Sequence, residues 1–482
     1  MMQAARRLTL LHTNDIHSHF EMMSPVSAVL AEARRAAGDE PVVVLDIGDH
    51  MDRAAVETEG SMGLANIDIL NLTRYDAVTL GNNEGLTFPA DVLETAYASL
   101  HCPAVCCNLV LAGSGERPGW LKPRLVVERG GIRIGITGAT AAFAPFYALL
   151  GWTALDPEEA LREQCRLLAE ESDIVVVLSH LGLPADELLA ARLDGVHAIL
   201  GGHTHHVLEQ PLLIGGTAVC GAGKFGRYVG RVVFERSGED GRFHFAEGGL
   251  LPVDAELVDP AVAAAVSVHY EHGRETLEET VAVTDRELPV EWQGESSFAN
   301  LLAQAVRAFT GAELSLVNSG QLLGSLPRGN VTAGMLHGLC PSPINPCLML
   351  LGGADIRLAA EQSLTEAYWN RPIYGYGFRG KVLGSLAIDG MTVRYEEQPG
   401  GDLSIREIRV GGLPLDDRKL YRVGTLDMFT FGSGYESIAH GSQVEYLLPH
   451  FLRDLLRMEL QRPGSLDEAD RRRWTPARSG EG

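Results

Sequence analysis

Short apolar runs alternate with longer amphipathic segments from residue 8 to about residue 235. Each run is short enough and apolar enough to form a buried strand. The clearest five cover residues 8–11, 42–45, 77–80, 174–178 and 198–200. Strands that alternate with amphipathic helices are typical of a layered α/β fold rather than of a meander.

A polar cluster follows each of these five runs. The clusters cover residues 12–17, 46–49, 81–84, 179–180 and 201–206. In open α/β sheets, ligands bind beyond the carboxyl ends of the strands, where polar groups point into one crevice. We therefore expect the five clusters to converge on a single site.

The pattern changes between about residues 256 and 285, where a helical, acidic stretch begins at Pro260. We take 256–285 as a connector between a first domain, 1–255, and a second domain, 286–482. The second domain is predicted to be α+β, with a helix over 301–308 and a strand over 313–317. The charged tail after Arg462 is expected to fray.

Composition narrows the functional classes. A formal charge of −23 leaves no basic face for a nucleic acid polymer, although a small anionic substrate can bind if cations reverse the local potential. No apolar run approaches the roughly 20 residues that cross a bilayer, so no membrane association is expected. Seven scattered cysteines indicate reduced thiols, and the short apolar start leaves no room for a leader, so we expect a cytoplasmic protein.

The polar clusters contain the ligands that a two-cation site requires, namely carboxylates able to bridge and imidazoles to complete each sphere. Asp15 with His17, and His203 with His205, repeat the same spacing. The candidate metal ligands are Asp15, His17, Asp49, Asn82, His180, His203 and His205. A single buried His is more often bonded to backbone, and Asp49 alone could cap a helix, but that explanation does not account for the whole set.

These motifs make the chain similar to the calcineurin-like metallophosphoesterases, and among them to the bacterial 5'-nucleotidase, UDP-sugar hydrolase and 2',3'-cyclic phosphodiesterase group. The matching segments are 11–17, 48–49, 81–84, 179–180 and 202–205, and beyond the connector 295–301 and 318–320. The resemblance covers nearly the whole chain. It implies a four-layer α/β/β/α metallophosphoesterase domain followed by an α+β substrate-binding domain.

The resemblance also implies two divalent metal ions that share Asp49. One ion would be held by Asp15, His17, Asp49 and His205, and the other by Asp49, Asn82, His180 and His203. Manganese or zinc suits such mixed spheres. A hydroxide that bridges the ions would attack phosphorus in line.

Asn83 is the main departure from the group, which has a His directly after the metal-binding Asn. We take Asn83 as the candidate catalytic donor, although an amide cannot carry positive charge or deliver a proton. His50 or Arg53 could compensate, or Asn83 could mark a different leaving group.

The second domain departs further. Relatives carry an Arg after a Gly-rich turn, whereas this chain has no Arg after 318–320 until Arg328. Phe429 and Phe431 either stack on a base or pack in the core. The candidate substrate-binding residues are Asn318, Gly320, Asn345, Phe429 and Phe431.

The predicted reaction is hydrolysis of a small-molecule phosphoester, with nucleoside 5'-monophosphates as the first choice of substrate. Cyclic nucleotides and nucleotide-sugar diphosphates are the next choices. Two rival functions stay open: a non-catalytic sensor that binds metal and nucleotide, and a related hydrolase of sulfur esters.

Overall fold

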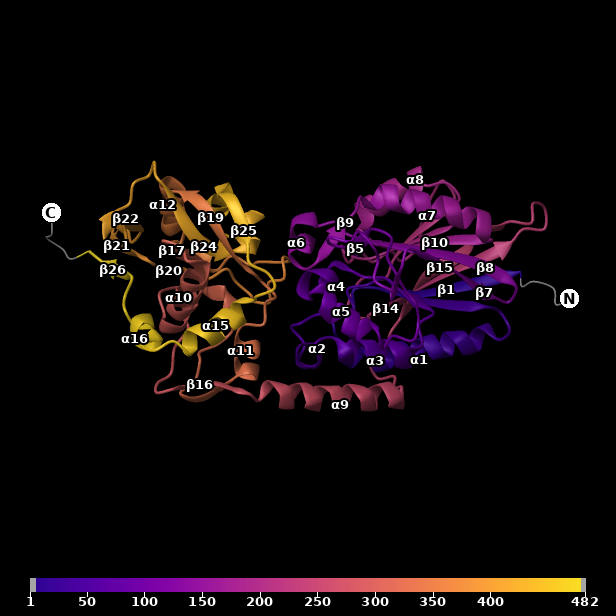
Figure 1. Cartoon of the computed structure of the whole chain (residues 1–482), viewed down its shortest axis with the longest axis horizontal. Helices are drawn as coiled ribbons and strands as arrows, with labels where there is room; N and C mark the ends of the chain where they lie inside the picture. The colour runs from indigo at the N-terminus through magenta and orange to yellow at the C-terminus, as the bar shows by residue number, and fades with distance from the viewer. Residues whose placement is uncertain (1–5, 478–482) are drawn as a thin grey trace. The chain divides into compact units, whose positions relative to one another are not determined.

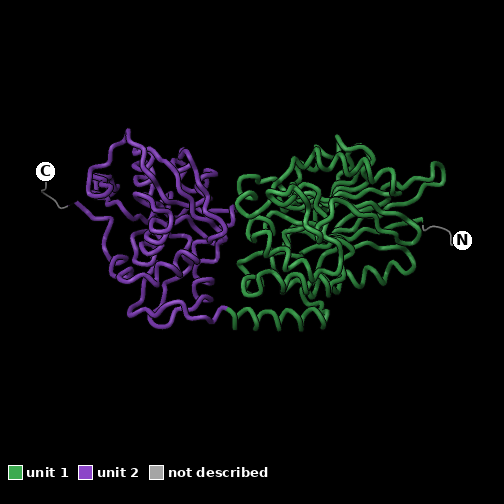
Figure 2. Tube along the Cα trace, in the orientation of Figure 1, with its two compact units in different colours: residues 1–276 green, residues 277–482 purple. Residues whose placement is uncertain are grey.

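The structure is a computed structural model, and it describes residues 6–477. The chain divides into two compact units, Met1–Thr276 and Leu277–Gly482, drawn in different colours in Figure 2. We describe each unit by itself.

Unit 1 contains two large sheets. The first has seven strands, in the order β15-β14-β1-β2-β3-β4-β6. Strands β1, β2, β3, β4 and β6 run parallel, whereas β14 is antiparallel to β1 and β15 is antiparallel to β14. Their bounds are β1 (Arg7–Thr13), β2 (Val42–Asp46), β3 (Ala77–Val78), β4 (Ala104–Val105), β6 (Leu121–Lys122), β14 (Tyr228–Arg236) and β15 (Phe243–Pro252).

The second large sheet of unit 1 has six strands, in the order β12-β13-β11-β10-β8-β7. Its strands are β7 (Arg124–Arg129), β8 (Ile132–Thr140), β10 (Ile174–His180), β11 (Ala198–Gly201), β12 (Leu212–Ile214) and β13 (Thr217–Gly221). A separate pair joins β5 (Leu109–Leu111) to β9 (Trp152–Ala154). All five predicted strands are confirmed, as β1, β2, β3, β10 and β11, although β3 ends at Val78.

The two sheets pack face to face around one apolar core, to which Leu10 and Leu45 contribute from one sheet and Ile134 and Val176 from the other. Helices α7 (Pro157–Glu171) and α8 (Leu183–Arg192) cover the outer face of the six-stranded sheet. Helix α1 (Phe20–Ala37) packs against β2 and β14 of the other sheet. The expected α/β/β/α layering is therefore confirmed (Figure 1).

The remaining helices of unit 1 are short, apart from α9. They are α2 (Val56–Ser61), α3 (Leu64–Thr73), α4 (Asn82–Thr87), α5 (Ala90–Tyr97), α6 (Ala144–Leu149) and α9 (Pro260–Leu277). Among residues 6–477, no helix combines the length and the apolar character that a membrane span requires.

Unit 2 is built on a five-stranded sheet in the order β20-β17-β24-β19-β25, with a four-stranded sheet in the order β23-β22-β21-β26 and the pair β16-β18. The strands are β16 (Thr280–Thr284), β17 (Leu314–Asn318), β18 (Gly329–Thr332), β19 (Pro346–Gly352), β20 (Leu386–Asp389), β21 (Met391–Glu397), β22 (Leu403–Val410), β23 (Leu413–Pro414), β24 (Leu420–Leu426), β25 (Ser442–Tyr446) and β26 (Trp474–Pro476).

Helix α10 (Ser297–Thr310) lies at the centre of this unit and buries Phe298, Leu302 and Val306 against the five-stranded sheet. The other helical segments are η1 (Ser319–Gln321), α11 (Ala333–Leu339), α12 (Gly353–Gln362), α13 (Glu366–Trp369), α14 (Asp427–Thr430), η2 (Glu436–His440), α15 (Leu452–Leu460) and α16 (Ser465–Ala469). The predicted helix and strand at its start are confirmed as α10 and β17.

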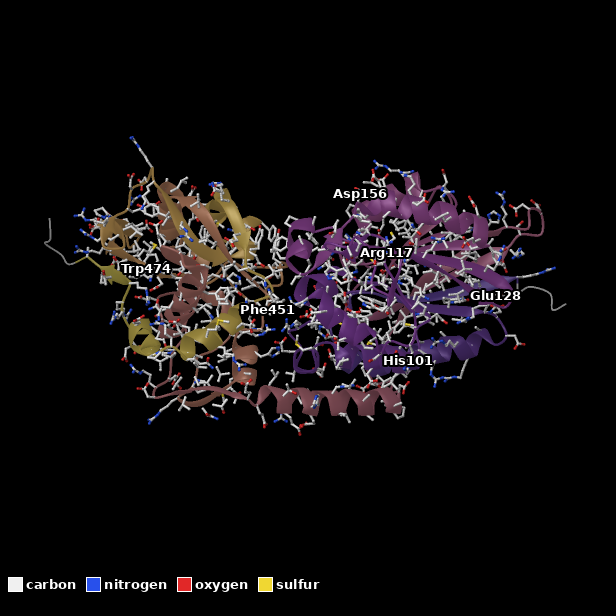
Figure 3. The ribbon with its side chains drawn as sticks, in the orientation of Figure 1. His101, Arg117, Glu128, Asp156, Phe451 and Trp474 are labelled. Atoms are coloured by element: carbon white, nitrogen blue, oxygen red, sulfur yellow. The ribbon has the colours of Figure 1, made fainter. Side chains whose placement is uncertain are left out.

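The tail after Arg462 is ordered as far as residue 477, so the prediction that it frays is wrong for this part, and residues 478–482 lie outside the described residues. Strand β26 pairs with β21, and Trp474, labelled in Figure 3, is buried. The Glu295 carboxylate accepts the backbone N–H groups of Arg473 and Trp474. Contacts with a residue so distant in sequence cannot be read from the composition of the tail.

Candidate metal centre

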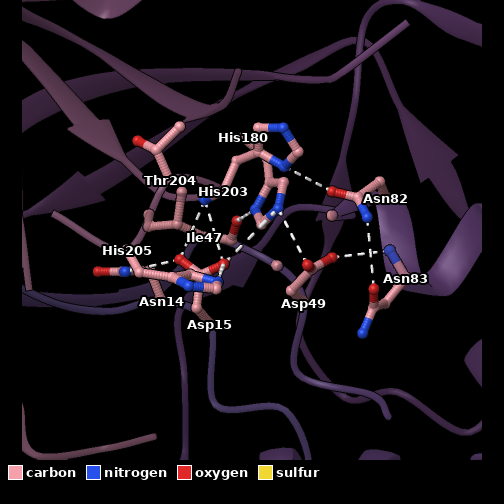
Figure 4. Close-up of polar contacts among 12 residues, drawn as sticks. Asn14, Asp15, Ile47, Asp49, Asn82, Asn83, His180, His203, Thr204 and His205 are labelled. Atoms are coloured by element: carbon pink, nitrogen blue, oxygen red, sulfur yellow. Dashed lines mark hydrogen bonds and ion pairs between the residues drawn. The ribbon is translucent and has the colours of Figure 1, made fainter. Parts of the chain in front are cut away.

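The candidate ligands lie together at the carboxyl ends of strands from both sheets. Asp15 and His17 follow β1, Asp49 follows β2, His180 ends β10, and His203 and His205 follow β11. Asn82 opens α4, after β3. Figure 4 shows that the side chains of the six labelled ligands point toward one another, and His17 Nε2 lies 3.8 Å from Asp15 Oδ1 and 3.7 Å from Asp49 Oδ2. All seven predicted ligands are therefore brought into one site.

The backbone at this site is strained. Five of the seven candidate ligands have φ in the left-handed region, which residues with a Cβ rarely adopt. These residues are Asp15 (+52°), His17 (+49°), Asp49 (+50°), His203 (+72°) and His205 (+57°). Such conformations cost about 1 to 3 kcal/mol each and cluster where function requires them.

One group of ligand atoms is formed by Asp15, His17 and His205. Asp15 Oδ1 lies 3.8 Å from His17 Nε2 and 3.4 Å from His205 Nε2. The two imidazole nitrogens are 3.2 Å apart. Three potential metal-binding atoms thus surround one small space.

A second group is formed by Asp15, Asp49 and His180. His180 Nδ1 donates to the Ile47 carbonyl at 2.7 Å, which leaves Nε2 as the lone-pair nitrogen of the neutral ring. Nε2 lies 3.3 Å from Asp49 Oδ2 and 3.8 Å from Asp15 Oδ1, yet it is buried and forms no hydrogen bond with residues 6–477. Beside this group, Asn82 Oδ1 faces His203 Nδ1 at 2.7 Å.

The protein fixes these carboxylates through neighbouring amides. Asp15 accepts the backbone N–H of His203 at 3.0 and 3.1 Å and the Asn14 Nδ2–H at 2.8 Å. The buried Glu84 carboxylate accepts the backbone N–H groups of Asp49 and Gly81, at 3.1 and 2.8 Å. Sequence analysis assigned no role to Asn14 or Glu84, although both stand inside the predicted clusters.

The loops after β2 and β3 approach so closely that only glycine fits. A Cβ on Gly48 would lie 2.2 Å from the Gly81 nitrogen, and a Cβ on Gly81 would lie 2.0 Å from Asp49 Oδ1. Gly48 also has φ of +83°. These glycines allow Asp49 and Asn82, which follow them, to reach the same site.

Opposite charges dominate the ionisation of the buried groups. Burial lowers the pKa of His180, but the carboxylates of Asp49 and Asp15 outweigh burial and raise it to about 10. Burial raises the pKa of Asp49, and His180 then lowers it below its ordinary value. Because histidine binds a cation in its neutral form, metal affinity is expected to increase with pH.

Asn83 lies at the site, but its side chain is bonded within the protein. Its Nδ2 is 3.1 Å from the Met51 carbonyl and 3.0 Å from His17 Nδ1, and its backbone N–H donates to Asp49 Oδ1 at 2.7 Å. His17 Nδ1 also lies 3.6 Å from Asp52 Oδ2, a carboxylate that sequence analysis missed. Asn83 and Asp52 thus hold the ring of His17, and a catalytic role of Asn83 stays a prediction.

The proposed substitutes for the missing cationic donor are also engaged elsewhere. Arg53 is paired with Glu59 at 2.7 Å and is buried. His50 is buried, and its Nδ1 is 3.2 Å from Asn66 Nδ2. Both residues support the loop behind Asp49 rather than face a substrate.

Three of the candidate substrate-binding residues of unit 2 contact the backbone of that unit through hydrogen bonds or close packing. Asn318 Nδ2 donates to the Leu383 carbonyl at 2.7 Å, and Asn345 Nδ2 donates to the His450 carbonyl at 2.8 Å. Gly320 packs so tightly that a Cβ would lie 2.0 Å from a backbone oxygen. All three are buried, so they do not present free polar groups to a ligand.

The two candidate aromatic residues differ. Phe429 is fully buried in the core of unit 2, which excludes it from stacking on a base. Phe431 is 46% exposed and stacks on Tyr376, with ring centroids 5.8 Å apart and planes 11° apart. Tyr376, which sequence analysis missed, is itself exposed. Of the predicted pair, Phe431 is the one exposed enough to meet a ligand.

Two family models match the chain. Residues 8–207 match the calcineurin-like phosphoesterases, and residues 275–440 match the 5'-nucleotidase C-terminal domain. The metallophosphoesterase YunD of Bacillus subtilis is 34% identical over 458 residues, which cover 94% of this chain and 99% of that protein. The chain belongs to the calcineurin-like metallophosphoesterases. It is a hydrolase with a 5'-nucleotidase C-terminal domain.

More distant proteins share the architecture of this metallophosphoesterase. A 5'-nucleotidase of Homo sapiens is 26% identical over 302 residues, which cover 55% of this chain and 52% of that protein. The crystal structure of the 5'-nucleotidase precursor of Thermus thermophilus superposes with a TM-score of 0.60 at 23% identity, covering 98% of this chain and 100% of that one. This likeness shows that the two-domain fold is shared.

Proposed function

We propose that this metallophosphoesterase uses two divalent metal ions to hydrolyse phosphate esters, with nucleoside 5'-monophosphates as first-choice substrates. The observation that carries the proposal is His180 Nε2, a buried nitrogen that has no hydrogen bond within the described chain and faces the carboxylates of Asp49 and Asp15. A buried polar atom in such a position needs a partner.

The residues present fit two divalent ions. Asp15, His17, Asp49 and His205 would hold one ion, and Asp49, Asn82, His180 and His203 would hold the other. The donor set mixes carboxylate, imidazole and amide groups, which suits manganese or zinc. The Ile47 carbonyl orients His180, and Asn83 with Asp52 orients His17, as outer partners of metal-binding histidines do.

Bound ions of this kind supply the positive charge that polarises a phosphoryl group and lowers the pKa of water. The chain itself provides orientation. Asn14 and the His203 N–H hold the Asp15 carboxylate, and Glu84 holds the loop of Asp49. These bonds keep the acceptor oxygens in place before a substrate arrives, which is the preorganisation that catalysis requires.

Nucleotides are favoured as substrates by two observations. The human relative, which matches 55% of this chain, is a 5'-nucleotidase, and this chain has a 5'-nucleotidase C-terminal domain. The exposed faces of Tyr376 and Phe431 offer a surface on which any base can stack. Cyclic nucleotides and nucleotide-sugar diphosphates carry the same chemical groups and are the alternatives.

The test is a hydrolysis screen with the purified full chain, supplied with Mn²⁺ or Zn²⁺, in which the products are separated by chromatography because only the monophosphates release inorganic phosphate directly. The panel contains nucleoside 5'-monophosphates, 2',3'-cyclic nucleotides, UDP-glucose and a thiosulfonate. Turnover of the monophosphates with a metal requirement supports the proposal. Turnover confined to the sulfur ester, or full activity after exhaustive chelation, would refute it.

A non-catalytic metal and nucleotide sensor is the second candidate. Asn83 favours this function because its amide is bonded to Met51 and His17 and provides no cation for a leaving group. Stoichiometric metal and measurable nucleotide binding, without turnover of any substrate in the panel, would establish the sensor and exclude the enzyme.

A further inference from the structure

Phe225 has a backbone conformation that bulky residues avoid. Its φ is +64°, in the left-handed region. Among residues 6–477, eleven residues other than glycine have positive φ, and five of these are candidate metal ligands. Phe225 shares the conformation of these ligands without being able to bind a metal, so its strain needs a separate explanation.

Hydrogen bonds tie the segment of Phe225 to the turn that carries Asp15. The Phe225 N–H donates to the Asp15 carbonyl at 2.8 Å. Asn14 Nδ2 donates to the Gly223 carbonyl at 2.6 Å, and Asn14 Oδ1 accepts the Ala222 N–H at 3.0 Å. Together these bonds fix the segment against the Asn14–Asp15 turn.

The ring of Phe225 lies against two histidines. It meets His17 edge to face, with centroids 5.9 Å apart and planes 76° apart, and it packs on His19 with centroids 3.9 Å apart. His17 also contacts Asn83 through its Nδ1. The ring of His17, a candidate ligand, is therefore held by Phe225 as well as by the amide of Asn83.

The segment has no room to relax away from the site. Gly226, which follows Phe225, has φ of +66°, and a Cβ there would lie 3.0 Å from Val26 and 3.2 Å from Met22 of α1. With the N–H of Phe225 held by the Asp15 carbonyl, rotation of φ at Phe225 to an ordinary value would move the ring away from His17.

We propose that Phe225 is a positioning residue for the metal centre. It holds the Asp15 turn and the imidazole of His17 in the orientation that binds a divalent cation. The strained backbone persists because the relaxed conformation would lose the contact between the Phe225 ring and His17. This inference rests on the proposed metal-dependent function and adds to it a residue outside the ligand set.

The experiment measures Mn²⁺ affinity by isothermal titration calorimetry of the full chain after chelation and dialysis. Phe225→Ala should lower the affinity by about 10-fold or more, the range found when outer partners of metal ligands are removed. Phe225→Tyr keeps the ring and should stay within about twofold of the wild type. Circular dichroism confirms that each variant is folded before titration.

A matched control separates this role from strain in general. Met62 also has positive φ, at +51°, and its side chain is 39% exposed at the end of α2. Met62→Ala should leave Mn²⁺ affinity unchanged. If Phe225→Ala does not fold, Phe225→Leu keeps most of the apolar bulk without the aromatic ring and should show the same loss of affinity.

The backbone strain at Phe225 can be measured separately, through the melting temperatures of two variants. Phe225→Gly and Phe225→Ala both lack the ring, but glycine adopts φ of +64° without penalty. The metal-free glycine variant should therefore melt at a higher temperature than the alanine variant, while both bind Mn²⁺ more weakly than the wild type. Wild-type Mn²⁺ affinity in a folded Phe225→Ala or Phe225→Leu variant would overturn the inference. A wild-type chain that binds no divalent ion would instead overturn the proposed function.

Discussion

The candidate site residues of the two units differ in how their polar groups are held. In unit 1, His180 Nε2 has no hydrogen bond within the described chain, and five candidate ligands have left-handed φ. In unit 2, the amides of Asn318 and Asn345 are bonded to backbone carbonyls. A buried nitrogen without a partner beside residues with strained backbones indicates a ligand site, whereas amides that are bonded to the backbone indicate a scaffold.

The largest effect is expected from Asp49→Ala, because Asp49 Oδ2 lies 3.3 Å from His180 Nε2 and 3.7 Å from His17 Nε2, and these two histidines are proposed ligands of different ions. The variant should lose bound metal and at least about 10³-fold in phosphate release, since a shared ligand of both ions is removed. Metal content by mass spectrometry and a phosphate assay check this. Asp427→Ala, which removes a buried carboxylate from unit 2, is the control for metal content. Two ions retained in Asp49→Ala would contradict the bridging role.

Phe429 and Phe431 allow a buried ring and an exposed ring to be compared within unit 2. Phe429→Ala should lower the free energy of unfolding by about 3 to 5 kcal/mol, because the ring is fully buried. Phe431→Ala should change it by less than about 0.5 kcal/mol, as expected for an exposed side chain. Urea unfolding measures both. An increase of KM for a nucleotide in Phe431→Ala alone would place the base on this exposed ring.

Two buried carboxylates should respond to pH in opposite ways. Burial raises the pKa of Asp427 to about 7, whereas His180 holds the pKa of Asp49 low. The folded chain thus keeps a proton on Asp427 that the unfolded chain releases, so the stability of the wild type falls as pH rises through about 4 to 7. Asp427→Asn cannot lose this proton.

The stability advantage of Asp427→Asn should therefore be absent near pH 4 and present near pH 8. It should amount to about 1.4 kcal/mol for each unit by which folding raises the pKa. Urea unfolding at both pH values measures the difference. An equal effect of the substitution at the two pH values would show that Asp427 is ionised in the folded protein.

The smallest effect is expected from Asn83→Ala. Loss of the contact with His17 should weaken Mn²⁺ binding by about 10-fold, which corresponds to about 1.4 kcal/mol. Asn345→Ala removes a comparable buried amide from unit 2 and should leave Mn²⁺ binding unchanged. If Asn83→Ala lowers the rate without changing Mn²⁺ affinity, Asn83 acts on the substrate after all.

The strands and their polar ends could be predicted because both follow from local composition. Buried parallel strands are apolar on both faces, so 8–11 and 174–178 stand out from their surroundings. The ordered tail could not be predicted, because Glu295 holds it from far away in the sequence. Phe429 and Phe431, only two residues apart, are indistinguishable until α14 buries one of them.

By itself, the sequence determined the layered α/β fold and the set of residues that meet at the candidate metal centre. The tertiary structure decided which atoms of that set face one another, and it brought the amide of Asn83 against the ring of His17. It also brought Phe225 to the same centre. The physical reason is that strand formation depends on neighbouring residues, whereas the direction of a side chain depends on two packed sheets and on loops joined from distant parts of the chain.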